Sequence, residues 1–137
     1  MPRVLLKNEY AEVTLDESTR IVHFRRSTTA LASKEAVERF FVELEAASPK
    51  KDRAQMRLLI DVREAPSRND PAFENAFIRF RPRIFGGFER RAVLVKSQVG
   101  KLQVNRLVRA AGLEERTFFD EAEARSWLLT GVERERA

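Results

Sequence analysis

The 137-residue chain has no cysteine, one histidine and no long apolar run, and each lack excludes a class of function. Without cysteine it can form no disulfide, no zinc–thiolate centre and no thiol nucleophile. A metal site would need oxygen ligands alone, and the sequence has no calcium-loop pattern. No apolar stretch approaches the roughly 20 residues of a membrane span, and the N-terminus is not typical of a signal peptide. We therefore expect a cytoplasmic protein that has no membrane span and binds no metal or organic cofactor.

The sequence also lacks the patterns that mark most small enzymes. The glycine pair in "FGGF" (85–88) has no lysine–serine pair behind it, and "VGKLQV" (99–104) lacks the upstream glycine of a phosphate-binding loop. The single histidine, His23, sits between apolar residues of an expected strand. Asp61 ends another expected strand, without an identified catalytic partner. These observations predict a protein that is not an enzyme, with no catalytic residues.

The composition fits one globular domain. With 43% hydrophobic and 34% charged residues, the chain is typical of a folded protein. We expect a single domain over residues 1–137, with an ordered core at about 4–131 and a frayed tail at 132–137. The net charge is +5, and most of the 26 basic residues are arginine, which suits phosphate and carboxylate binding. Interspersed acidic residues also fit an ordinary mixed-charge surface.

The first half of the chain changes from a strand period to a helix period. Residues 11–15 alternate apolar and polar, "DEST" makes a turn, and 20–24 resume the alternation, which predicts a β-hairpin over 11–24 with a short strand at 4–6 before it. After Ser33, the apolar residues Val37, Phe40, Phe41 and Leu44 share one helical face. The run from Arg57 to Val62 reads as an interior strand.

The second half repeats helix and strand. Asp70-Pro71 is a strong helix start, Phe73, Phe77 and Phe80 share one face, and Pro82 is expected to end that helix. Residues 91–96 and 116–119 read as strands. Between them we expect a helix capped by Ser97 that ends at Gly112, its buried face including Val99, Leu102, Leu107 and Val108. A last helix is capped by Asp120 with Glu123, anchored by Trp127 and Leu128, and closed by Gly131.

This order predicts the fold class. After the hairpin, strands alternate with helices, which requires mostly parallel pairing and right-handed crossovers. We expect an α/β domain with a mixed, mostly parallel sheet, an N-terminal β-hairpin and about four amphipathic helices.

Three segments carry a resemblance to a known family. "RLLIDVRE", "RAVLVKS" and "VNRLVRAAGLEERTFFDEAEARSWLLTG" are similar to the SpoIIAA-like branch of the STAS superfamily, over roughly residues 10–131. The resemblance implies a regulatory or scaffolding module without catalysis that binds a protein partner. Its SEC14-like relatives imply an alternative, a carrier or sensor of a small hydrophobic or lipid-like ligand.

The resemblance also selects the loop after the strand that ends at Asp61. In anti-sigma-antagonist members, an Asp-Ser-Ser-Gly element there carries a phosphorylated serine, whereas this chain has "NDPA" (69–72). Asp70 falls at or beside the phosphoacceptor position, and the resemblance implies the hypothesis that it is a fixed negative charge at a helix start in place of a phosphoserine. Ser67 is the remaining serine, near Arg63 and Arg68. The candidate partner-binding residues are Asp61, Arg63, Ser67, Arg68 and Asp70.

A second candidate surface lies in the arginine- and phenylalanine-rich segment 73–91. We expect Phe85 and Phe88 at the surface beside the glycine turn, where they and the neighbouring arginines would bind a ligand or a second copy of the chain. These candidates for ligand binding or self-association are Arg79, Arg81, Arg83, Phe85 and Phe88. Interleaved aromatic and basic residues also suit nucleic acid, but the helical spacing of the other phenylalanines argues against it.

Overall fold

The computed structural model describes residues 2–66, 71–110 and 115–132. The strands are β1 (Arg3–Lys7), β2 (Ala11–Asp16), β3 (Ile21–Arg26), β4 (Arg57–Asp61), β5 (Arg90–Leu94) and β6 (Arg116–Phe118). The helices are α1 (Lys34–Ala47), α2 (Pro71–Phe85), α3 (Gln98–Ala110) and α4 (Glu121–Thr130), with a 3₁₀ turn at Arg53–Gln55. The predicted α/β class is confirmed, with the N-terminal hairpin formed by β2 and β3.

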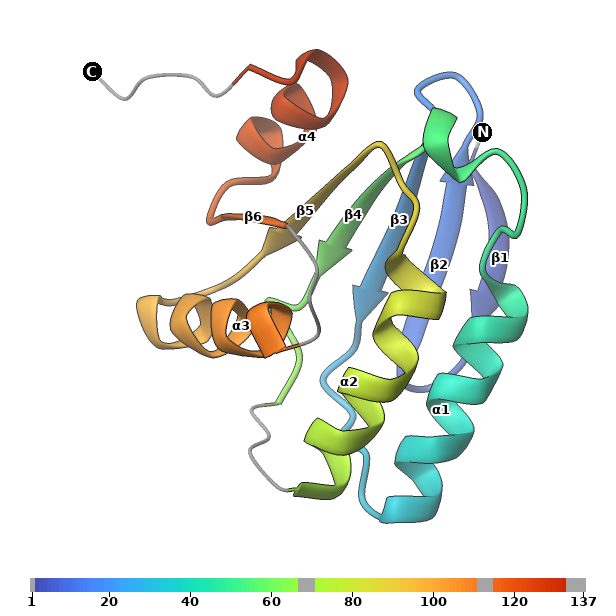
Figure 1. Ribbon diagram of the computed structural model, residues 1–137, viewed down its shortest axis with the longest axis vertical. Helices are drawn as coiled ribbons and strands as arrows, with labels where there is room; N and C mark the ends of the chain where they lie inside the picture. Colours follow the sequence, from blue (N-terminus) through green and yellow to red (C-terminus); the bar gives the residue numbers. More distant parts are fainter. Residues whose placement is uncertain (1, 67–70, 111–114, 133–137) are drawn as a thin grey trace.

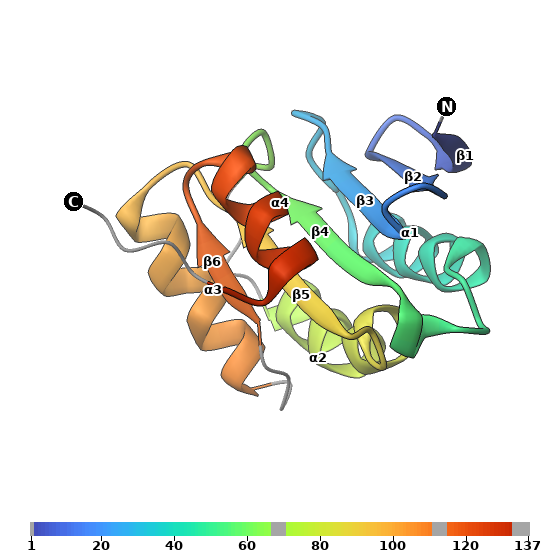
Figure 2. The same ribbon diagram turned by 90° about the horizontal axis from the view of Figure 1, so that it is seen from above.

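All six strands form one sheet whose order follows the chain, from β1 at one edge to β6 at the other (Figure 1). The first three strands pair antiparallel, and β3 to β6 pair parallel. Three successive right-handed crossovers in one direction place their helices on the same face of a sheet. Accordingly α1 and α2 lie on one face, and α4 lies on the other (Figure 2).

The alternation of each strand divides the interior into two cores. One core joins α1, α2 and α3 to the sheet and contains most of the phenylalanines. The other is smaller and lies under α4, where Ile21, Leu59, Ala92 and Leu94 meet Leu128. Leu59 and Ile60 are neighbours on β4 yet belong to different cores, because successive side chains of a strand point to opposite faces of the sheet.

The predicted caps explain where two helices begin. The Ser33 hydroxyl accepts the Ala36 amide at 3.1 Å at the start of α1, and the Asp120 carboxylate accepts the Glu123 amide at 3.0 Å at the start of α4. Gly131 ends α4 with a positive φ of 73°, a backbone conformation that favours glycine. The expected ends Asp70 and Gly112 lie outside the described residues, as does most of the tail.

The expectation that Pro82 ends its helix is wrong, because α2 continues to Phe85. Proline cannot bond to the carbonyl of Ile78, but Ile78 lies on the exposed side of α2, where water can replace that bond. Beyond the proline, Ile84 and Phe85 are buried, and the Gly86 amide bonds to the Pro82 carbonyl at 3.0 Å. Burial of the last turn therefore offsets one missing hydrogen bond.

Two expectations about exposure are also wrong. Phe85 and Phe88 are buried rather than at the surface, because the last turn of α2 and the loop after it fold onto the sheet. On α3, Val99 and Leu102 are 75% and 68% exposed. Leu107 is buried as expected and Val104 packs against the core beside it, while the side chain of Val108 lies outside the described residues, so the apolar residues of α3 are divided between an inner and an outer face.

Candidate functional site

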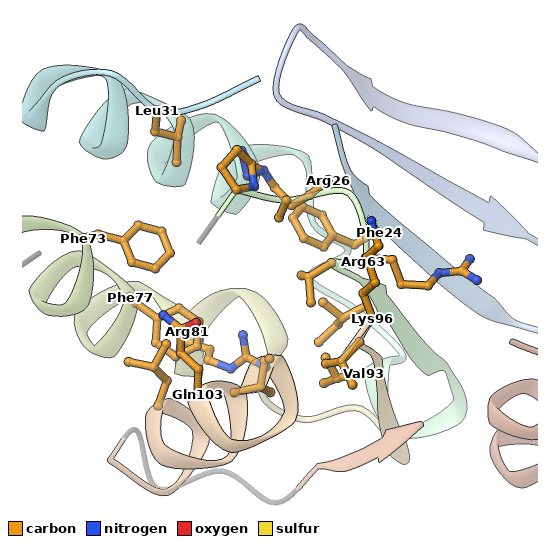
Figure 3. A pocket seen from close by; sticks show the side chains of 18 of the residues that line it. Phe24, Arg26, Leu31, Arg63, Phe73, Phe77, Arg81, Val93, Lys96 and Gln103 are labelled. Carbon is orange, nitrogen blue, oxygen red and sulfur yellow. The ribbon is translucent and has the colours of Figure 1, made fainter. Parts of the chain in front are cut away.

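A cavity of about 280 Å³ lies between the sheet and helices α1, α2 and α3 (Figure 3). It opens at the carboxyl ends of β3, β4 and β5, which lie together because these strands run parallel. Its sheet wall consists of the residues that β3, β4 and β5 turn toward the helices, among them Phe24, Ile60 and Val93. The pocket is thus a space left inside the larger core.

Aromatic side chains form much of the pocket wall. Phe40 and Phe41 come from the predicted inner face of α1, and Phe73, Phe77 and Phe85 come from α2. The rings contact one another across the two helices, with a centroid distance of 6.2 Å between Phe41 and Phe73. Phe24 of β3 lies 5.5 Å from Phe85. These rings give the pocket a largely apolar wall.

Four cationic side chains also line the pocket, and no acidic residue does so among the described lining residues. They are Arg26 at the end of β3, Arg63 after β4, Arg81 in α2 and Lys96 after β5. Figure 3 shows all four around the same space. The pocket therefore combines an apolar wall with cationic side chains.

Arg81 is fixed in the wall by a buried ion pair. Its side chain is 4% exposed and that of its partner Glu115 is 1% exposed. The Arg81 guanidinium lies 4.4 Å from the Phe77 ring centroid and 4.8 Å from that of Phe85. Burial lowers the pKa of Arg81 from its ordinary value, and the Glu115 carboxylate opposes that change. This pair closes the inner end of the pocket between α2 and the residues before β6.

Arg26 is held by backbone carbonyls. Its guanidinium donates to the Tyr10 carbonyl at 3.1 Å and to the Thr29 carbonyl at 2.8 Å, and lies 5.4 Å from the Phe40 ring centroid. These bonds tie the β1–β2 turn to the segment that leads into α1. They also position a cation at the end of β3, beside the pocket wall.

Arg63 connects the pocket to the opposite face of the sheet. It donates two hydrogen bonds to the buried Asp61 carboxylate, at 3.0 and 2.8 Å, and a third to Glu121 of α4 at 3.1 Å. Burial alone would raise the pKa of Asp61, but the Arg63 bonds hold this pKa below its ordinary value. The same bonds raise the pKa of Arg63. Asp61 is thus an ionised anchor for the start of the β4–α2 loop.

The charge network continues along α4 to His23. Arg125 donates to Glu121 at 2.9 Å, and its other end lies 3.4 Å from Nδ1 of His23. Burial and the nearby Arg125 lower the pKa of His23, and its Nε2 has no hydrogen-bond partner in the part of the chain that the structure describes. His23 projects from the α4 face of β3 and is not among the residues that line the pocket.

The mouth of the pocket is formed by the lining residues that are also exposed. They come from three connections at the carboxyl edge and are Ala30, Pro66, Lys96, Ser97 and Val99. The Ser97 hydroxyl accepts the Gly100 amide at 3.1 Å, which orders the start of α3. Lys96 makes no ion pair with any described residue. The rim is therefore apolar on most sides, with one exposed lysine.

The structure brings together only part of the sequence-predicted sites. Asp61 and Arg63 are bonded to each other at the strand end, while Ser67, Arg68 and Asp70 lie outside the described residues. Of the second group, Arg81 and Phe85 line the pocket. The other three members lie elsewhere, since Arg79 and Arg83 pair with Glu38 and Glu45 on α1, and Phe88 packs under Arg53.

Sequence reasoning missed Arg26, Lys96 and the contribution of α1. Arg26 and Lys96 each follow the apolar residues of a strand, as Asp61 does. Polar residues after parallel strands meet at one edge, so their positions carried a usable signal. The phenylalanines of α1 gave no such signal, because a buried aromatic and a pocket-lining aromatic have the same helical period.

The arrangement is suited to binding. Among the described residues, no group of three potential metal ligands occurs. Within the same ranges, no helix has the length and apolar character needed to cross a bilayer. The pocket presents aromatic rings, guanidinium groups, an ammonium group and the Ser97 hydroxyl. These groups can surround an apolar molecule and neutralise a negative charge.

Comparison with known proteins gives one match. The family model described as SpoIIAA-like matches residues 22–129, which is most of the chain and includes every pocket-lining residue. No curated protein and no solved structure matches significantly.

Proposed function

The chain belongs to the SpoIIAA-like family, and from this premise we propose that it is a non-enzymatic carrier or sensor that binds a small apolar ligand with a negatively charged end. The cavity beside the carboxyl edge of the sheet is the binding site. The observation that carries the proposal is an aromatic-walled pocket lined by four cationic side chains and, among the described residues, by no carboxylate. Its volume of about 280 Å³ is near the lower end of ligand sites, roughly 300 Å³.

The two ends of the ligand would contact different parts of the pocket. Phe73, Phe77 and Phe85 offer an apolar surface to its body. The negative end would lie at the mouth, where Lys96 is exposed and makes no ion pair with a described residue. Arg63 and Arg81 already hold carboxylates, so they form part of the wall and do not offer a vacant partner to the ligand.

Dodecanoate and dodecanol are suitable probes because they share an apolar chain and differ in charge. We expect native mass spectrometry to show one dodecanoate per chain and weaker retention of dodecanol. The Lys96→Gln variant should bind dodecanoate about fivefold more weakly, since one partly exposed charge pair contributes up to about 1 kcal/mol. Its affinity for dodecanol should stay the same.

A pocket-filling variant tests the location of the site. Val104 lines the cavity from α3, and Val104→Phe places a ring in that space. Binding of both probes should fall at least tenfold while the unfolding midpoint stays near that of the parent protein. Undiminished binding by the folded variant would place the ligand elsewhere and refute this function. As a control, Val42→Ser changes an exposed valine on α1 and should alter neither binding nor folding.

A second candidate function is recognition of a protein partner. SpoIIAA-like domains generally serve as regulatory protein-interaction modules. The loop after β4 begins with the bonded pair Asp61 and Arg63 and exposes Glu64 and Pro66. We propose that a partner would bind the 63–72 segment, with Ser67, Arg68 and Asp70 contributing from the residues outside the described range.

This candidate is tested by a photo-crosslinking residue at Glu64, expressed in the native host. A specific adduct that disappears with Arg68→Ala supports partner recognition through the loop. If Asp70→Asn preserves both folding and the adduct, Asp70 does not act as a permanent charge in place of a phosphoserine. Intact mass of protein from the same host tests Ser67, where the absence of added phosphate would contradict modification. Light scattering measures self-association.

A further inference from the structure

We propose that the outward face of α3, together with the pocket mouth, is a docking surface for an anionic phospholipid bilayer. The docking face is defined by the exposed residues Val99, Leu102, Arg106 and Arg109, with Lys96 and Lys101 beside it. This inference goes beyond ligand binding, because it names the surface with which the protein would associate.

The first observation is the exposure of two large apolar side chains on one helix. Val99 is 75% and Leu102 is 68% exposed, the highest values among the large hydrophobic side chains described. Together with Arg106 and Arg109 they follow the spacing of a single helical stripe. Val104 and Leu107 face inward, so burial against the sheet already uses the other apolar side of α3. The outer pair therefore contributes nothing to the core.

The second observation is the charge around that pair, and it determines the partner. Helix α3 has no acidic residue and carries Lys101, Arg106 and Arg109, with Lys96 just before its first turn. Only Arg106 has an ion-pair partner among the described residues, Glu74 at 2.5 Å. Exposed apolar residues flanked by Lys and Arg are the pattern of helices that lie in the interface of an anionic membrane.

A similar exposed valine on α1 lies in an environment of mixed charge, where Glu38 and Glu45 pair with Arg79 and Arg83 of α2. Val42 is 55% exposed, but Glu38 and Glu45 lie four residues before it and three residues after it on the same helical face. Exposure of a valine is thus not specific to α3. The combination of exposed apolar side chains with cations is what distinguishes the α3 surface.

The third observation is continuity with the pocket. Val99 and Lys96 line the cavity and are exposed, so they belong both to the docking face and to the mouth. A bilayer that contacts α3 would face the opening through which an apolar ligand enters or leaves. Such a ligand could then exchange without crossing water. Docking itself does not require an occupied pocket.

Co-sedimentation of the full chain with vesicles tests the proposal. We expect binding to phosphatidylcholine vesicles containing about one-third phosphatidylserine, little binding to pure phosphatidylcholine, and release at high salt. Each lysine or arginine near an anionic surface contributes about fivefold. The variant Lys96→Gln/Lys101→Gln/Arg109→Gln should therefore lose on the order of a hundredfold. Val99→Ser/Leu102→Ser should lose at least tenfold, because it removes the inserted apolar groups.

A matched control changes an exposed valine outside the docking face. Val42→Ser should bind vesicles like the parent protein, and all variants should keep the parent unfolding midpoint, because they change exposed residues. Equal binding to neutral and anionic vesicles, no vesicle binding, or binding unchanged in the α3 variants would overturn the proposal. So would binding of an oligonucleotide in place of vesicles.

The pocket and the docking face can fail separately. Val104→Phe should abolish dodecanoate binding and leave vesicle binding intact, whereas Leu102→Ser, which changes an exposed residue outside the pocket lining, should weaken vesicle binding and retain dodecanoate. Loss of both activities in both variants would mean that one surface serves them together, which contradicts a docking face distinct from the pocket.

Discussion

The two faces of the sheet are built from the same strands but packed differently. Under α4, the small residues Ala92 and Ala124 let the helix lie close to the strands, and Leu59, Leu94 and Leu128 are fully buried between them. On the other face, phenylalanines from β3, α1 and α2 meet at angles and enclose a cavity. The two faces therefore differ in composition, with alanines and leucines under α4 and phenylalanines around a space that can accept a ligand on the other face.

Charges are also distributed differently between the faces. On the pocket face, Arg81 and Glu115 are both withdrawn from water. On the α4 face, Asp61 is buried but its partner Arg63 remains about one-third exposed. A buried pair costs more to break than a pair with one end in solvent, so the two faces should respond differently to loss of a charge.

The largest expected effect is breakage of the pair on the pocket face. Glu115→Leu leaves the Arg81 guanidinium buried without its carboxylate and should lower the free energy of unfolding by about 3–5 kcal/mol. Urea unfolding measures the change. The double variant Arg81→Met/Glu115→Leu should recover most of the loss, since both charges of the pair are then removed, while Arg91, which also lies 4.0 Å from Glu115, keeps its charge. Asp61→Asn on the other face should cost less, about 1–3 kcal/mol. If Glu115→Leu and Asp61→Asn lower the free energy of unfolding equally, the two faces do not differ in their response to loss of a charge.

An intermediate effect is expected when side chains are enlarged on the two faces. Ala124→Leu forces extra volume into the filled core under α4 and should cost about 1–3 kcal/mol. Val104→Phe adds volume beside the cavity and should change the free energy of unfolding by less than about 1 kcal/mol. Thermal and urea unfolding of both variants compare them directly. If Val104→Phe proves as costly as Ala124→Leu, the cavity is not available space in solution.

The smallest expected effect is the change of stability with pH that His23 causes on the α4 face. Burial and Arg125 hold the pKa of His23 below its ordinary value of 6.5, so the unfolded chain takes up a proton first as the pH falls. Stability should therefore decline as the pH falls from 6.5 toward the folded-state pKa of His23 and then level off. Arg25, Asp61 and Glu121 also surround this ring, but the pKa values of Asp61 and Glu121 lie below their ordinary values of 3.8 and 4.5, outside this window.

His23→Gln should remove that decline while leaving stability above the window nearly unchanged. Unfolding free energies at about pH 8 and about pH 5 measure the difference. A parent protein whose stability rises on acidification between these two values would show that the pKa of His23 is higher in the folded state than in the unfolded chain, contrary to its position beside Arg125.

The sequence predicts elements well where one period and one cap agree. Ser33 and the face from Val37 to Leu44 predict α1 because nothing local contradicts them. Prediction fails where a tertiary contact outweighs a local rule, as at Pro82, where burial of Ile84 and Phe85 extends α2. On α3 it succeeds for Leu107 and fails for Val99 and Leu102, because the apolar residues of this helix lie on two faces and the sequence alone does not say which face contacts the sheet.

The candidate site is predicted less completely than the fold. Asp61 could be placed at the carboxyl edge because parallel strand ends share one edge. Its bonds to Arg63 depend on side-chain geometry, and the bond from Arg63 to Glu121 joins residues 58 positions apart. The cavity itself is a property of how rings from three elements fail to fill a volume, which no periodicity encodes.

The chain-order arrangement of the strands has a consequence for synthesis on the ribosome. Each strand pairs with its immediate predecessor, and α1, α2 and α3 can cover their face as soon as each crossover emerges. The opposite face has no cover until α4 has been made. Its apolar residues therefore stay exposed to solvent until Ala124 and Leu128 pack on them, and these residues are Ile21, Leu59, Ala92 and Leu94. A nascent chain halted before α4 would expose an apolar sheet face to chaperones or to a neighbouring chain. Burial of this face therefore depends on α4, which is made after all six strands.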